Sequence, residues 1–144
     1  MRNLFLLLAA PLAVAAQPAL AQEIGRIKNV TPGGIEVVRD GDKLNANSGF
    51  PLIEGDIVVT GARQRAGITL ADHTRLSVAP RSRMIISKYR FNRAQGSGES
   101  IIGVDRGAVG VDSGRLSKTW NMRFRAGSST LGVRGTHFVI EVDE

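Results

Sequence analysis

Residues 66–84 read AGITLADHTRLSVAPRSRM, and their alternation of apolar and polar side chains decides the fold class. Thr74, Leu76 and Val78 fall on one side of an extended chain, and the residues between them are polar. A period of two is typical of a β-strand with one face on a core and the other in water. Proline cannot donate a backbone hydrogen bond to a neighbouring strand, so we expect this strand to end before Pro80.

The same alternation recurs nearer the C-terminus, where the inward positions are Met122, Phe124, Ala126, Phe138, Ile140 and Val142. All 17 glycines lie beyond residue 22, and turn signals occur at 32–34, 40–41, 55–56, 96–98 and 113–114. We expect a polar loop from Ala94 to Ser100. No stretch of ten or more residues has helical spacing. The sequence therefore predicts an all-β single domain of many short antiparallel strands, arranged as a twisted sandwich, a roll or a short solenoid.

Residues 1–21 have the plan of a secretory signal peptide. Arg2 is followed by an apolar run from Leu4 to Ala16, and small residues then precede a cleavage site that we place between Ala21 and Gln22. The alternative is a retained membrane anchor, but the run of 13 residues is shorter than the roughly 20 that span a bilayer as a helix. We therefore expect residues 22–144 to form one domain without a transmembrane anchor or a further domain, located in the periplasm or secreted.

The charge balance limits the partners that the mature chain can bind. Without Arg2 the chain has 18 basic and 13 acidic residues, a net charge of +5. Export makes nucleic acid an unsuitable partner, so the expected anions are lipopolysaccharide, phospholipid headgroups or acidic proteins. The simpler alternative is that the basic residues only solvate the strand faces. The chain has no cysteine, which excludes disulfides, thiol chemistry and a lipid anchor on cysteine.

Two blocks resemble the FecR domain when they are taken with their spacing. The first covers residues 52–61 and 66–84, with a Gly-Asp turn, an Asp-x-Thr hairpin and a Pro-x-Ser motif. The second covers residues 104–111 and 131–140 and contains Val-Arg-Gly-Thr-x-Phe. The resemblance runs from about Ile24 to Val142. Its characteristic residues are Gly55, Asp56, Asp72, Pro80, Arg134, Gly135 and Thr136. It implies an all-β periplasmic domain that binds proteins in envelope signalling.

These characteristic residues favour a structural role over a chemical one. Glycine at 55 and 135 permits the left-handed backbone of a turn, and the Asp or Thr that follows can bond the local backbone. We expect Arg134 to be partly buried and paired with Asp56 or Asp72. His73 stands where the family has glycine, and we expect it to be an exposed turn residue, because histidine tolerates left-handed backbone better than most residues.

A search for catalytic groups favours a protein that is not an enzyme. His73 and His137 have no second histidine or cysteine at metal-ligand spacing, and along one strand Glu141 would lie too far from His137 to share an ion. A triad of Ser128, His137 and an aspartate lacks any supporting motif. No glycine-rich loop leads into a helix. We therefore predict no catalytic residues, no metal and no cofactor.

Two features suit binding. Basic residues cluster between Arg81 and Arg93, and at strand spacing Tyr89 and Phe91 face the core while Lys88 and Arg90 face solvent. Either this is a plain basic outer face, or it docks an anionic partner. Trp120 either caps the core or is an exposed interface anchor. The candidate partner-binding residues are Lys88, Arg90, Arg93 and Trp120.

The leading hypothesis is a periplasmic FecR-domain protein that binds a signalling protein of the envelope or membrane, such as a receptor, transporter or sensor. The alternative is a structural module that binds the cell wall or a surface polysaccharide. An enzyme is the third and weakest hypothesis.

Overall fold

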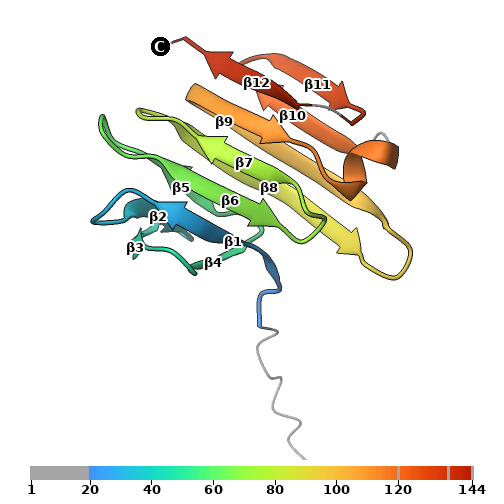
Figure 1. Cartoon of the computed structure of the whole chain (residues 1–144), viewed down its shortest axis with the longest axis horizontal. Coiled ribbons are helices and arrows are strands. Elements are labelled where there is room, and N and C mark those ends of the chain that lie inside the picture. Colours follow the sequence, from blue (N-terminus) through green and yellow to red (C-terminus); the bar gives the residue numbers. More distant parts are fainter. Residues whose placement is uncertain (1–19, 120, 136, 144) are drawn as a thin grey trace, which may run out of the picture.

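The computed structural model describes residues 20–119, 121–135 and 137–143, which fold almost entirely into strands (Figure 1). The expected leader, Trp120 and Thr136 lie outside the described residues, apart from Leu20 and Ala21. The elements are β1 (Glu23–Val30), β2 (Ile35–Arg39), β3 (Asp42–Ala46), β4 (Pro51–Ile53), β5 (Ile57–Val59), β6 (Ala66–Leu70), β7 (Arg75–Val78), β8 (Arg83–Asn92), β9 (Ser97–Asp112), the 3-10 helix η1 (Arg115–Thr119), β10 (Met122–Ala126), β11 (Ser129–Val133) and β12 (His137–Val142). No helix in this part of the chain is long and apolar enough to cross a membrane.

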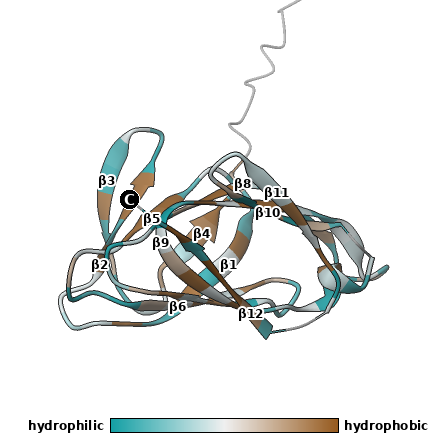
Figure 2. Ribbon diagram, turned by 90° about the horizontal axis from the view of Figure 1, so that it is seen from above, coloured by the Kyte–Doolittle hydropathy of each residue, from teal (hydrophilic) through white to brown (hydrophobic). Residues whose placement is uncertain are grey.

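The strands form one curled sheet with two layers that share β9. The first layer has the strand order β4-β1-β6-β7-β9-β12, and the second has the order β3-β2-β5-β8-β9-β10-β11. Figure 2 shows β6 and β12 in one layer and β8, β10 and β11 in the other. All described strand pairs are antiparallel except β9 with β10, which is parallel. The all-β prediction is confirmed, and of the predicted arrangements the curled sheet corresponds to the twisted roll.

β9 passes from one layer to the other at Gly107. Residues before this glycine pair with β8 and β10, and residues after it pair with β7 and β12. Gly107 has a φ of 78°, and a Cβ atom there would lie 2.3 Å from the hydroxyl oxygen of Ser82. That hydroxyl accepts the Ala108 N–H at 3.0 Å. The bend therefore needs both a glycine and the serine of the Pro-x-Ser motif.

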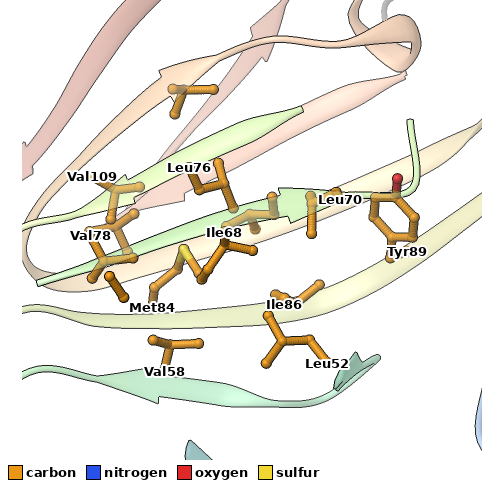
Figure 3. Packing of buried hydrophobic residues seen from close by; sticks show 14 of the residues in the cluster. Leu52, Val58, Ile68, Leu70, Leu76, Val78, Met84, Ile86, Tyr89 and Val109 are labelled. Atoms are coloured by element: carbon orange, nitrogen blue, oxygen red, sulfur yellow. The ribbon is translucent and has the colours of Figure 1, made fainter. Parts of the chain in front are cut away.

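The core lies between the two layers and is aliphatic (Figure 3). The predicted inward faces are confirmed. Thr74, Leu76 and Val78 are buried, and so are the inward residues of β10 and β12 except Ala126, Phe138 and Val142, which are partly buried. Phe124 and Phe138 meet edge to face with ring centroids 5.4 Å apart, which joins β10 of one layer to β12 of the other. β7 ends at Val78, as expected from Pro80.

One predicted boundary is wrong. The expected loop from Ala94 to Ser100 is shorter, because β9 already begins at Ser97 and the turn occupies residues 93–96. Ser97–Ser100 pair with the end of β8 through backbone hydrogen bonds, which need no apolar side chain. A Cβ atom at Gly98 would lie 1.9 Å from the Arg90 carbonyl oxygen. Gly98 was expected in a loop, but in the structure its lack of a side chain permits close strand pairing.

The bend in β9 predicts a strong sensitivity at Gly107. We expect Gly107→Ala to lower the free energy of unfolding by at least about 2 kcal/mol, since left-handed backbone costs an L-residue about 1–2 kcal/mol and the new methyl group meets Ser82. Gly132→Ala is the matched control, because nothing lies within 4 Å of its Cβ position. Urea unfolding of both variants tests the assignment, and equal stabilities would contradict it.

Candidate binding groove

Asp56 is fully buried and is held by an arginine from a neighbouring strand. Nε and Nη2 of Arg39, at the end of β2, donate to the two carboxylate oxygens at 2.8 and 2.7 Å. The Ile53 N–H adds a third bond at 2.9 Å. The hydrogen bonds to Asp56 raise the pKa of Arg39. A bidentate, hydrogen-bonded pair of this kind ties β2 to the turn between β4 and β5.

This finding corrects the expected role of Arg134. That side chain is exposed in the segment between β11 and β12, and it is not the arginine that binds Asp56. Asp72 does not pair with Arg134 either, because its carboxylate accepts hydrogen bonds from Thr74, Tyr89 and Leu116. Arg39 belongs to none of the sequence motifs, and it lies beside Asp56 only because β2 pairs with β5. Gly55 and Gly135 do have positive φ angles, as expected for turns.

Asp72 is also fully buried, in the hairpin between β6 and β7. Its carboxylate accepts the Thr74 hydroxyl at 2.7 Å, the Tyr89 hydroxyl at 2.8 Å and the Leu116 N–H at 3.1 Å. The Thr74 N–H adds a bond at 3.2 Å. The Tyr89 oxygen accepts the Asp72 N–H in return, at 2.9 Å. These bonds join the hairpin, β8 and η1 in one network (Tyr89 is labelled in Figure 3). Burial, followed by the charge of Asp72, raises the pKa of Tyr89 far above its usual value.

The Asp72 network sets the positions of the side chains around a groove. His73 follows Asp72 in the hairpin and is exposed with a φ of 70°, as predicted. The Arg115 N–H donates to the Asp72 carbonyl at 2.8 Å, and its guanidinium lies over the Phe91 ring at 5.6 Å from the centroid. Phe91 follows Tyr89 by two residues. The groove therefore combines residues from the three segments that the network connects, the hairpin, β8 and η1, with residues of β1.

We define the basic groove as two adjoining hollows of about 490 and 430 Å³ that share Thr69, His73 and Arg115. A larger hollow of about 920 Å³ continues past Arg93 and Phe91. The cations that line the groove and this extension are Arg26, Lys28, Arg75, Arg90, Arg93, Arg115 and Lys118.

The carboxylates beside these cations are already engaged. Glu23 pairs with Arg26 at 2.7 Å, and Asp112 pairs with Arg75. These hydrogen bonds lower the pKa of both acids, so they remain ionised. Glu54 accepts the Tyr89 N–H at 2.9 Å.

Within the described chain no acidic group forms a salt bridge with the remaining cations, Lys28, Arg90, Arg93, Arg115 and Lys118. The groove therefore has an excess of positive charge that an anionic ligand would neutralise.

The predicted binding residues divide between this groove and another surface. Arg90 and Arg93 are exposed and line the extension of the groove. Lys88 does not line it: its ammonium group pairs with Glu99 at 2.8 Å, and Glu99 also bonds Arg123. Tyr89 is buried and Phe91 is partly buried, as expected. Trp120 lies outside the described residues. Lys28, Arg115 and Lys118 were missed because they are isolated basic residues on other elements.

The two histidines belong to different parts of the fold. His137 contacts Asp112 at 3.2 Å, whereas His73 is at the hairpin tip. No group of three potential metal ligands occurs within the described residues.

The fold and groove together define a small all-β domain with a surface suited to anionic ligands. A family model described as FecR protein matches residues 56–144, more than half of the chain. The chain therefore belongs to the FecR family, which is associated with the regulation of signalling at the cell envelope. The match begins at Asp56, whereas the resemblance was placed from about Ile24. No curated protein and no solved structure matches the chain.

The Asp56 pair predicts a large cost when its arginine is removed. We expect Arg39→Met to lower the free energy of unfolding by about 3 kcal/mol, because a buried carboxylate loses its countercharge while the aliphatic stem is kept. Arg63→Met is the control and should change stability by less than about 1 kcal/mol, because Arg63 is exposed. Thermal and urea unfolding would compare the two variants, and equal stabilities would contradict the assignment.

Tyr89 is the only tyrosine in the chain, so its ionisation can be followed directly. We expect no phenolate absorbance near 295 nm at pH 10, where an unperturbed tyrosine is half ionised. Since the raised pKa means that only the unfolded state loses this proton, stability should be retained below pH 10 and fall as pH rises above it. The Tyr89→Phe variant provides the blank and should itself lose about 2 kcal/mol. Phenolate formation in the folded protein near pH 10 would refute the buried network.

Proposed function

We propose that this protein acts in the periplasm, after cleavage of residues 1–21, as a non-enzymatic domain that binds an envelope or membrane signalling protein. The excess of cations in the basic groove is the single observation that carries the proposal. Membership of the FecR family supports the signalling context. The leader-like residues 1–21 support the location.

The chemistry of the groove favours an acidic segment of a protein as the ligand. Arg93, Arg115 and Phe91 all line the groove, and the Arg115 guanidinium lies over the Phe91 ring, so carboxylates and a short apolar stretch could both be accommodated. Guanidinium groups remain protonated and supply charge and hydrogen bonds, but neither a general base nor a nucleophile. The guanidinium groups of the groove therefore support recognition of an anionic ligand.

Charge reversal in the groove tests this proposal. We expect the double variant Arg93→Glu/Arg115→Glu to abolish capture of the partner from a detergent-solubilised envelope extract, with the protein still folded by circular dichroism. Both substitutions keep the backbone N–H groups, including the one that binds Asp72. The control is Arg63→Glu/Arg65→Glu, which makes the same change in net charge at exposed residues outside the groove.

The salt dependence of binding is the second readout. Capture through the groove should weaken as ionic strength rises, because salt screens exposed charges over about 8 Å at 0.15 M. Purified sacculi and lipopolysaccharide serve as competing probes. Retention on sacculi alone, unaffected by the groove variant, would support the cell-wall module in place of the signalling function.

A further inference from the structure

β12 is an edge strand that carries an exposed apolar residue at its centre. Among the described residues its only strand partner is β9. In Figure 1 it runs along the outer margin of the molecule, beside the C-terminus. Exposed edges generally carry lysine, proline or a bulge that blocks another strand. β12 instead has Val139, whose exposed fraction of 68% exceeds that of every described large apolar residue except Leu20.

The inner face of β12 is also incompletely covered. Phe138 and Val142 point towards the core but are only partly buried, whereas Ile140 between them is 4% exposed. The corresponding positions on β7, which has strands on both sides, are 1–2% exposed. A further strand beside β12 would cover this remaining apolar surface.

The order of side chains along β12 is complementary to itself. Its outward positions are His137, Val139 and Glu141, with the apolar residue at the centre. If two such strands pair antiparallel about an axis at Val139, each His137 lies opposite Glu141 of the partner subunit. Phe138 then lies opposite Ile140 of the partner subunit on the inner face. An isologous interface requires this kind of self-complementarity.

We propose that two copies of this chain associate through β12, antiparallel and centred on Val139, so that the first layers of both copies form one continuous sheet. The pair of valines supplies the apolar centre of the contact, and the histidine and glutamate pairs set its register. β11, the edge of the second layer, lacks this pattern, since its described residues carry no charge. The inference concerns a different surface from the basic groove and does not depend on the groove's ligand.

Sedimentation velocity of the mature protein over a wide concentration range tests the association. We expect twice the monomer mass for the native chain and the monomer mass for Val139→Lys, which places two ammonium groups opposite each other. Because Val139 is exposed, the variant should stay folded, with the circular dichroism spectrum of the native chain. Leu131→Lys is the matched control: it places the same charge at an exposed leucine on β11, at 47% exposure, and should remain a dimer. A native monomer at every concentration, or a dimer unaffected by Val139→Lys, would overturn the proposal.

The absence of cysteine permits a second, positional test. Residues directly opposite in an antiparallel pair have Cα atoms about 4.5–5.5 Å apart, within the range of a disulfide. We expect Val139→Cys to cross-link into a covalent dimer under mild oxidation, and Leu131→Cys to remain largely monomeric on a denaturing gel. Equal cross-linking of the two variants, or none of either, would contradict an axis at Val139.

Discussion

The carboxylate of Asp72 is fully buried, and its bonds constrain the arrangement of everything around the groove. A carboxyl group inside a protein is tolerated only when hydrogen-bond partners replace the water that it has lost. Here Thr74, Tyr89 and Leu116 provide those partners from the hairpin, β8 and η1. If any one of these elements shifted, a buried polar group would lose its hydrogen bond. The network therefore fixes the hairpin, β8 and η1 relative to one another.

Buried polar side chains are satisfied in the same way at Asp56 and at Ser82 of the Pro-x-Ser motif. Asp56 is satisfied by Arg39 and a backbone N–H, and Ser82 by the backbone of Ala108 beside the bend in β9. Asp56, Asp72 and Ser82 each lie between two strands, where the sheet's own hydrogen bonds stop. The buried polar residues of the motifs therefore specify the connections between strands, while the alternating apolar residues specify the strands themselves.

This division explains what could be predicted from the sequence. The alternation in residues 74–78, 122–126 and 137–142 is a local property, and it correctly predicted which side chains face the core. Pairing between distant segments is not local. Nothing in the chain distinguishes Arg39 from Arg134 as the partner of Asp56 until β2 is placed beside β5. The early start of β9 was missed for a related reason, because strand pairing at Gly98 depends on the backbone of β8.

The groove was predictable only in part, because its cations come from elements that the fold brings together. Arg93 belongs to a visible basic cluster, whereas Lys28 and Arg115 are single residues in unremarkable surroundings. Arg115 belongs both to the buried Asp72 network and to the groove. Its backbone N–H is bound by Asp72, and its guanidinium covers Phe91 in the groove. Asp56, Asp72 and Ser82 already use their polar groups within the fold. These motif residues therefore build a scaffold, and the cations that the scaffold holds in place are the groups left to bind a ligand.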